Sequence, residues 1–243
     1  MTAEPRPAFY ALAPGGWRDY VTLLHPPYTL WHLSYVAIGA GLAPELEAER
    51  LLAALAAFFL AIGIGAHALD ELNGRPLRTQ IPSRVLVSLA AASIGGAVAI
   101  GVYASIAYTA WLAPVVAAGA FIVCAYNLEL FGGAFHSDTW FALAWGSFPL
   151  LAAYLAAAER ITLEALLAAV FAGFLSLAQR LLSTQVRTVR RRVAHVTGTL
   201  ELRDGGREPV TAELLTRAPE SALRALTVAV TALAVALVVL RLR

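Results

Sequence analysis

The residues of this chain best suited to bind a charged ligand gather first in a short polar segment, AHALDELNGRPLRTQIP, between two long apolar stretches. Within it, His67, Asp70 and Glu71 have helical i, i+3 and i+4 spacing, so they share one face of a helix. Ionisable side chains that face lipid are costly, so we expect this face to point into a helix bundle or a hydrated cavity. The alternative is a solvated loop in which the two carboxylates pair with Arg75 and Arg78.

A basic group lies at the end of a later apolar stretch. One helical face there carries Arg180, Thr184, Arg187 and Arg191. Guanidinium groups match the oxygens of a phosphate group and bind it without a metal ion. Carboxylates contact a diphosphate only through a bridging cation, and Mg²⁺ is usually held by one or two carboxylates together with substrate phosphates. The two segments together favour binding of a phosphorylated ligand.

We expect these residues to be held in place by apolar helices. Hydrophobic residues make up 59% of the chain and charged residues 14%, and the mean hydropathy is +0.69. This balance indicates a polytopic membrane protein. A spanning helix needs about 20 apolar residues, and we predict an all-α transmembrane helix bundle of about seven spans. The predicted spans are Tyr28–Ala43, Leu51–Leu69, Val85–Ala107, Trp111–Phe131, Trp140–Ala158, Ile161–Leu182 and Ala222–Leu240.

The placement of charge predicts how the bundle is oriented. All 18 basic residues are arginine, and most of them lie in loops on the same side as the N-terminus. Positive loops stay in the cytoplasm, so we predict a multi-pass protein of the plasma (inner) membrane with a cytoplasmic N-terminus. The expected partners of these arginines are membrane lipid and a phosphorylated substrate, and not nucleic acid, because the arginines adjoin apolar helices. Cys124 is the only cysteine, which excludes an intrachain disulfide.

Residues 1–243 are predicted to form a single membrane domain. Residues 1–27 contain the Pro, Gly and aromatic residues typical of an interfacial segment at the level of the lipid headgroups. Residues 183–219 form a predicted Arg-rich cytoplasmic loop. In it the preceding helix continues through the arginines, and TLELRDGGREPV forms an extended piece with a Gly-Gly turn.

Weaker polar signals lie around the loop between the fourth and fifth predicted spans. Tyr126 and Asn127 are candidates to line a cavity, although an interfacial position is the commoner role of a tyrosine at a helix end. His136 and Asp138 have the spacing of metal ligands, but Ser137 and Asp138 also make an ordinary helix N-cap, which we favour.

Several of these segments resemble the UbiA superfamily of intramembrane prenyltransferases. LLHPPYTLWHLSYVAIGAGLA, a second apolar span and then AHALDELNGRPLRT are similar to the first part of that family, whose second helix ends in an Asn-Asp-x-x-Asp-x-x-x-Asp motif that binds magnesium and a prenyl diphosphate. TQVRTVRRRVAHVTGTLELRDG resembles the family's region after the sixth helix, and AYNLELFGGAFHSD its Tyr-containing cytoplasmic loop. The resemblance implies a UbiA-like bundle that transfers an isoprenoid from a prenyl diphosphate to an aromatic or lipid acceptor.

The chain also departs from the family pattern. On the first motif, Ala66 takes the Asn position and His67 the first Asp position, Asp70 matches the second, and Gly74 takes the third. Arginines take the places of both aspartates of a second motif, and the family usually has nine spans. These departures leave Asp70 and Glu71 to hold one Mg²⁺ ion, for which a histidine is a poor ligand.

Two roles follow from the resemblance. In the catalytic role, Asp70 and Glu71 hold the cation while Arg187 and Arg191 clamp the diphosphate. The residues that bind substrate in that role are His67, Asn73, Arg75, Arg78, Tyr126, Asn127, Arg180 and Thr184. In the alternative role, the chain is a catalytically inactive membrane protein of the same fold that binds lipid, an isoprenoid or a partner subunit. An acidic residue of the first motif then pairs directly with an arginine of the second.

Overall fold

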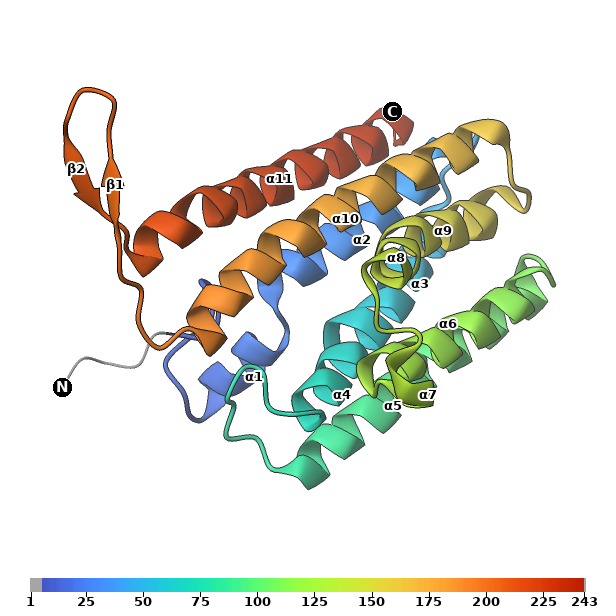
Figure 1. Cartoon of the computed structure of the whole chain (residues 1–243). Coiled ribbons are helices and arrows are strands. Elements are labelled where there is room, and N and C mark those ends of the chain that lie inside the picture. The colour runs from blue at the N-terminus through green and yellow to red at the C-terminus, as the bar shows by residue number, and fades with distance from the viewer. Residues whose placement is uncertain (1–5, 243) are drawn as a thin grey trace.

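The computed structural model describes residues 6–242. It is helical apart from loops and one small hairpin, in agreement with the predicted all-α class (Figure 1). In chain order, the elements are α1 (Trp17–Leu23), α2 (Pro26–Leu42), α3 (Ala48–Phe58), η1 (Phe59–Ala66), α4 (His67–Leu72), α5 (Ser83–Ala107), α6 (Leu112–Asn127), α7 (Leu130–Gly133), α8 (Asp138–Ala142), η2 (Leu143–Ser147), α9 (Phe148–Ala158), α10 (Leu163–Arg192), β1 (Thr199–Glu201), β2 (Arg207–Pro209) and α11 (Ala212–Arg241). The segments η1 and η2 are π-helical and join their neighbours into two continuous helices.

Five helices of the described chain are long and apolar enough to cross a membrane. They are Ala48–Leu72, Ser83–Ala107, Asp138–Ala158, Leu163–Arg192 and Ala212–Arg241. Backbone groups inside a bilayer need partners within the segment, which is why apolar stretches of this length form helices. The other two predicted spans correspond to α2, with 17 residues, and α6, with 16 residues. That these two shorter helices also cross stays a prediction.

The fourth predicted span, Trp111–Phe131, is wrong at its C-terminal end. Helix α6 stops earlier, and the chain then turns through Glu129 and Phe131, which both have positive φ angles. Left-handed backbone interrupts a right-handed helix, so LFGG forms only the short α7. The turn brings His136 back to the end of α6, where its Nδ1 lies 3.1 Å from the carbonyl oxygen of Tyr126.

The predicted cytoplasmic loop 183–219 is helical at both of its ends. Helix α10 continues through the arginines to Arg192, as predicted, and α11 already begins at Ala212. The extended piece between them is the antiparallel hairpin of β1 and β2, and its turn contains Gly205 with a φ of 84°. Glycine adopts this left-handed conformation without steric cost. The hairpin projects beyond the ends of α10 and α11 (Figure 1).

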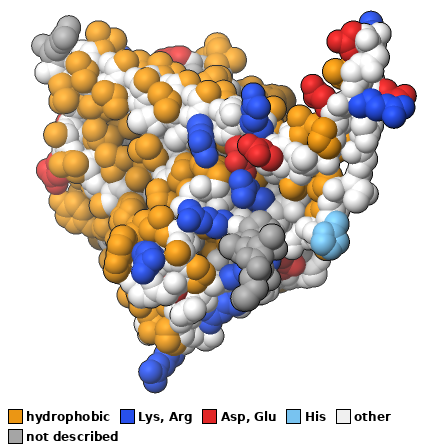
Figure 2. Space-filling view, turned by 90° about the vertical axis from the view of Figure 1, so that its left-hand side faces the viewer, with side chains coloured by type: hydrophobic (Ala, Val, Ile, Leu, Met, Phe, Trp, Pro, Cys, Tyr) orange, Lys and Arg blue, Asp and Glu red, His pale blue; other side chains and the backbone are white. Residues whose placement is uncertain are grey.

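Successive long helices alternate in direction, so their ends gather at the two ends of the bundle (Figure 1). At one end, Arg190 of α10 pairs with Glu220 of α11 at 2.5 Å. At the other, Arg50 of α3 pairs with Glu159, which follows α9, at 2.7 Å. The first is called the arginine-rich end, because its loops and helix termini carry Arg18, Arg75, Arg78, Arg84, Arg187, Arg190, Arg191 and Arg192. Figure 2 shows arginine side chains gathered on this end, with hydrophobic side chains over the adjoining surface.

Helix α2 packs between α9 and α11 and fixes the centre of the bundle. Gly39 lies directly against the backbone of Leu150, so α2 and α9 approach closely, as small residues allow in membrane bundles. Nearer the arginine-rich end, a ring nitrogen of His32 lies 2.8 Å from the carbonyl oxygen of Trp145 in η2. Short π-helical stretches are frequent at functional sites, and η1 leads directly into the polar segment of α4.

The N-terminal segment covers the arginine-rich end. Asp19 is buried, and its Oδ1 accepts a hydrogen bond from the N–H of Gly15 at 2.9 Å while its Oδ2 accepts from the N–H of Gln80 at 2.8 Å. The Nε of Arg191 donates to the carbonyl oxygen of Pro7 at 3.2 Å. The predicted interfacial segment is thus part of the bundle from residue 6 onward, and its first five residues lie outside the described ones.

Candidate functional site

A polar cavity of about 100 Å³ lies at the arginine-rich end, between the N-terminal segment and helices α2, α4, α6, η2 and α10. Its charged lining residues are Asp70, Arg180, Arg187 and Arg191. Four histidines also line it, namely His25, His32, His67 and His136. The predicted acidic and basic segments therefore face one cavity, although they lie far apart in the sequence.

Asp70 and Glu71 are neighbours in the sequence but have different surroundings. Successive side chains of a helix point about 100° apart, so Asp70 lines the cavity whereas Glu71 is fully buried against the loop after α4. The Oε2 of Glu71 accepts a hydrogen bond from the N–H of Leu77 at 2.9 Å. Its Oε1 accepts from the N–H and the hydroxyl group of Thr79 at 2.8 and 2.9 Å. We therefore assign Glu71 a structural role in place of the predicted metal-binding and catalytic one.

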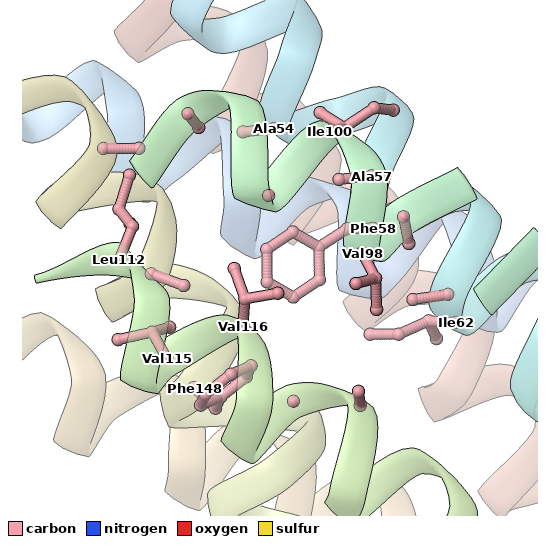
Figure 3. A pocket seen from close by; sticks show the side chains of 18 of the residues that line it. Ala54, Ala57, Phe58, Ile62, Val98, Ile100, Leu112, Val115, Val116 and Phe148 are labelled. Carbon is pink, nitrogen blue, oxygen red and sulfur yellow. The ribbon is translucent and has the colours of Figure 1, made fainter. Parts of the chain in front are cut away.

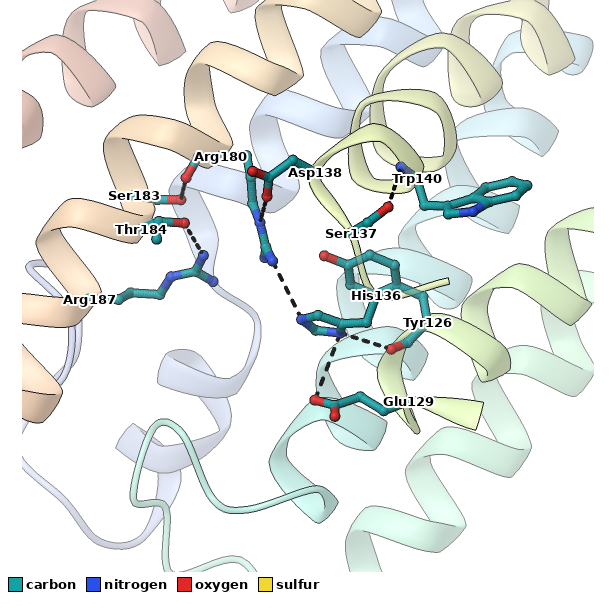
Figure 4. A network of polar contacts seen from close by, with 10 residues as sticks. All are labelled: Tyr126, Glu129, His136, Ser137, Asp138, Trp140, Arg180, Ser183, Thr184 and Arg187. Carbon is teal, nitrogen blue, oxygen red and sulfur yellow. Dashed lines mark hydrogen bonds and ion pairs between the residues drawn. The ribbon is translucent and has the colours of Figure 1, made fainter. Parts of the chain in front are cut away.

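Arg180 is neutralised by a neighbour on α8 (Figure 4). Its Nε donates to the Oδ1 of Asp138 at 3.0 Å, and its Nη2 lies 3.4 Å from the Nε2 of His136. The expected helix N-cap is present here, because the Oγ of Ser137 accepts from the N–H of Trp140 at 3.2 Å. Asp138 therefore balances the charge of Arg180 and is not part of a metal site with His136.

Arg187 and Arg191 have no carboxylate partner among residues 6–242. The Nη2 of Arg187 donates to the hydroxyl group of Thr184 on the same helix at 2.9 Å (Figure 4), and Arg191 contacts the backbone of the N-terminal segment. In the described part of the chain, no ion pair joins either guanidinium group to Asp70. The direct pairing predicted for the inactive role is therefore not formed, and both guanidinium groups line the cavity without a direct ion pair in the described chain.

Three buried polar atoms on the cavity wall have no hydrogen-bond partner within the described residues. They are the Nε2 of His25, the hydroxyl oxygen of Tyr126 and the Oε1 of Gln179. These residues are 8%, 5% and 2% exposed. An unpaired buried polar group costs about 1–3 kcal/mol, and a polar ligand or ordered water in the cavity would remove that cost. The lining is therefore suited to a polar occupant.

His25 stands at the cavity wall just before α2. Its Nδ1 lies 2.8 Å from the hydroxyl oxygen of Tyr10, and its ring stacks on His67 with 4.0 Å between ring centroids. Burial lowers the pKa of His25 well below its ordinary value, and the neighbouring His67 and arginines act in the same direction. Burial also raises the pKa of the Tyr10 hydroxyl well above its ordinary value. Both groups are neutral at neutral pH and offer hydrogen bonds rather than charge.

The other residues predicted to bind substrate divide into two groups. Those that line the cavity are His67, Tyr126 and Asn127. Those outside its lining are Asn73, Arg75, Arg78 and Thr184. Arg75 donates to the carbonyl oxygen of Ile81 at 2.5 Å and to the hydroxyl group of Ser83 at 2.8 Å, so it holds the loop before α5 in place. Thr184 acts on the cavity indirectly, through its hydrogen bond with Arg187.

Sequence reasoning missed the cavity positions of Tyr10, His25, Gln179 and Trp145. Gln179 had a signal, because a neutral amide next to Arg180 interrupts an otherwise apolar helix. Tyr10 had no such signal, because tyrosine is common at membrane interfaces whether or not it lines a cavity.

A second cavity of about 120 Å³ is almost wholly apolar and lies between α3, α5, α6 and α9 (Figure 3). Phe58, Val116 and Phe148 are among the side chains that surround it. Trp145 lines both this cavity and the polar one. Trp145 is therefore a residue that the polar and the apolar cavity share.

The predicted Mg²⁺ site needs carboxylate oxygens that are free to bind the ion. With both oxygens of Glu71 already hydrogen-bonded, Asp70 is the one carboxylate on the cavity lining within the described chain. Among residues 6–242, no three His, Cys, Asp or Glu side chains form a group that could hold a metal ion. Coordination of Mg²⁺ by Asp70 and Glu71 together does not fit this arrangement.

Comparison with known proteins gave no match to a protein-family model, to a curated protein or to a solved structure. The UbiA resemblance therefore stays a prediction from sequence motifs, and the assignment of function depends on the chemistry of the two cavities.

Proposed function

We propose that this chain is a multi-pass protein of the plasma (inner) membrane with a UbiA-like fold of about seven spans and a cytoplasmic N-terminus. In this proposal it binds an isoprenoid diphosphate at the arginine-rich end and transfers the isoprenoid to an aromatic or lipid acceptor. The observation that carries the proposal is the pair Arg187 and Arg191, two guanidinium groups without carboxylate partners in the described chain that face one polar cavity.

Transfer from an allylic diphosphate breaks a carbon–oxygen bond and leaves negative charge on the departing diphosphate. Preorganised positive groups in a site with little water stabilise that charge as it develops. Arg187 and Arg191 have this position, and a guanidinium fork bonds two phosphate oxygens at once. Arg180 contributes less, because Asp138 already neutralises it.

The isoprenoid part of the ligand needs apolar and aromatic surroundings. Trp145 stacks with Phe141 at a centroid distance of 5.8 Å and lies 4.3 Å from the ring of Tyr126. Aromatic faces attract cations, so these rings suit an allylic carbocation next to the departing diphosphate. The apolar cavity beyond Trp145 offers space for part of a hydrocarbon chain.

Binding of farnesyl diphosphate to the purified chain in lipid nanodiscs tests the proposal. Arg187→Gln is expected to weaken binding by at least about tenfold, since it removes one charge-assisted contact with phosphate. Arg192→Gln is the matched control, because Arg192 lies on the same helix but is exposed and outside the cavity lining. Equal affinity of parent and Arg187→Gln, or no saturable binding, would refute the proposal.

The alternative role, a non-catalytic protein of the same fold, makes a different prediction from the same preparation. Release of pyrophosphate from farnesyl diphosphate, measured with membrane lipid and candidate phenolic acceptors present, supports the transferase. Tight binding that depends on Arg187 without any release supports a protein that binds an isoprenoid lipid or presents it to a partner subunit.

A further inference from the structure

The cavity lining of the described chain offers a single carboxylate for holding a diphosphate through metal ions. Mg²⁺ prefers oxygen ligands and is usually bound by one or two carboxylates plus substrate phosphates. Glu71 points into the loop after α4, and Asp138 is paired with Arg180. Asp70 is left as a single carboxylate on the lining of the described cavity.

The histidines do not replace the missing carboxylates. Each of the four already uses one ring nitrogen inside the protein. The partners are the Tyr10 hydroxyl for His25, the Trp145 carbonyl for His32, the Gly63 carbonyl for His67 and the Tyr126 carbonyl for His136. Imidazole nitrogen also suits softer metals better than Mg²⁺. Within the described chain, no three potential metal ligands form a group.

The charge balance of the cavity favours an anion over a cation. Arg180 is neutralised by Asp138, so the remaining charges are the two guanidinium groups of Arg187 and Arg191 and the carboxylate of Asp70. The lining of the cavity thus has an excess of positive charge. A divalent cation would add to that excess, whereas the diphosphate anion reverses it. A guanidinium group also binds phosphate oxygens directly, through two parallel N–H donors.

We propose that the cavity binds the diphosphate through the guanidinium groups of Arg187 and Arg191 without a divalent cation. Asp70 is then a like-charged neighbour of the ligand and not a metal ligand. The inference rests on the proposed function, because it assumes that a diphosphate occupies the cavity. It also reverses the direction in which Asp70→Asn is expected to change the affinity for the diphosphate, so it can be tested separately from the proposed function.

Asp70→Asn gives opposite results in the two cases. If a metal ion bridges Asp70 and the diphosphate, loss of the carboxylate weakens binding. If guanidinium groups alone hold the diphosphate, removal of a nearby negative charge tightens binding, by about 3- to 10-fold for charges several ångströms apart in a partly buried site. The variant is expected to fold, because the Asp70 side chain makes no hydrogen bond or ion pair within the described residues.

The experiment measures the dissociation constant of farnesyl diphosphate in nanodiscs, with excess Mg²⁺ and with excess EDTA, for the parent, Asp70→Asn, Arg187→Gln and Arg192→Gln. We expect parent affinities within twofold of each other in the two buffers, tighter binding by Asp70→Asn, weaker binding by Arg187→Gln and no change in Arg192→Gln. Thermal unfolding of each variant verifies that it is folded.

Binding that requires Mg²⁺ and weakens in Asp70→Asn overturns the metal-free inference and leaves the proposed function standing. Absence of farnesyl diphosphate binding in both buffers overturns the proposed function and the inference together. The two failures are therefore distinguishable from one set of titrations.

Discussion

Replacement of Glu71 by glutamine is expected to destabilise the protein strongly, although the side chain keeps its size. Both carboxylate oxygens accept hydrogen bonds from the loop after α4, from the N–H of Leu77 and from the N–H and hydroxyl group of Thr79. An amide has one acceptor oxygen. Whichever way it is oriented, an NH₂ group then faces at least one backbone N–H that has no other acceptor.

The size of the effect follows from the bonds that are lost. A hydrogen bond to a charged group contributes about 1.5–3 kcal/mol, and a buried donor without a partner costs about 1–3 kcal/mol more. Together these give a loss of about 3–5 kcal/mol in the free energy of unfolding. For a chain of this length, 1 kcal/mol shifts the melting temperature by about 2–4 °C, so we expect a decrease of about 10 °C.

The matched control is Asp70→Asn, the same chemical change at the adjacent residue. The Asp70 side chain makes no hydrogen bond or ion pair within the described chain, so the free energy of unfolding of this variant should differ from that of the parent by less than about 1 kcal/mol. Thermal unfolding in detergent solution gives both values. Hydrogen exchange of the backbone N–H groups of Leu77 and Thr79 reports the loop directly, and it should accelerate in Glu71→Gln alone.

Two outcomes would contradict these expectations. If Glu71→Gln melts like the parent and the loop exchanges at the parent rate, Glu71 does not hold the loop. If Asp70→Asn is as destabilised as Glu71→Gln, the two carboxylates do not have the separate surroundings that the structure gives them.

Three further predictions concern single side chains. Tyr126→Phe removes a buried hydroxyl group without a partner among the described residues, so the free energy of unfolding should stay equal or rise by up to about 1 kcal/mol, and a clear decrease in thermal unfolding would contradict this. His25 has a lowered pKa in the folded state, so its contribution to stability is complete above its ordinary pKa of 6.5 and is lost as the pH falls below that value. The difference in unfolding free energy between the parent and His25→Asn should therefore decrease at acid pH, by up to about 1.4 kcal/mol per pH unit, and a difference that does not vary with pH would contradict it. Gly39→Ala places a methyl group against the backbone of Leu150 and should lower the melting temperature by several degrees, whereas Gly95→Ala on α5 meets no atom within 4 Å and should not lower it.

The apolar pattern was sufficient to predict the helices, because inside a bilayer each backbone N–H and C=O needs a partner in its own segment. The pattern fails at Glu129 and Phe131, where left-handed backbone ends α6 inside an apolar run. Hydropathy does not predict the φ angle of an individual residue. The helical spacing of the arginines was likewise readable, since it depends only on the periodicity of one helix.

From the sequence alone, the long apolar helices and the acidic and basic helix ends were predictable, because hydropathy and helical periodicity are local properties of the chain. Which of the two neighbouring carboxylates faces the cavity depends on the packing of the helices, because contacts with α5 and α6 set the rotation of α4 about its axis. The tertiary structure also brings Tyr10 and His25 to one wall with Gln179. Side chains this far apart in the sequence come into contact only through helix packing, which a local sequence pattern does not predict.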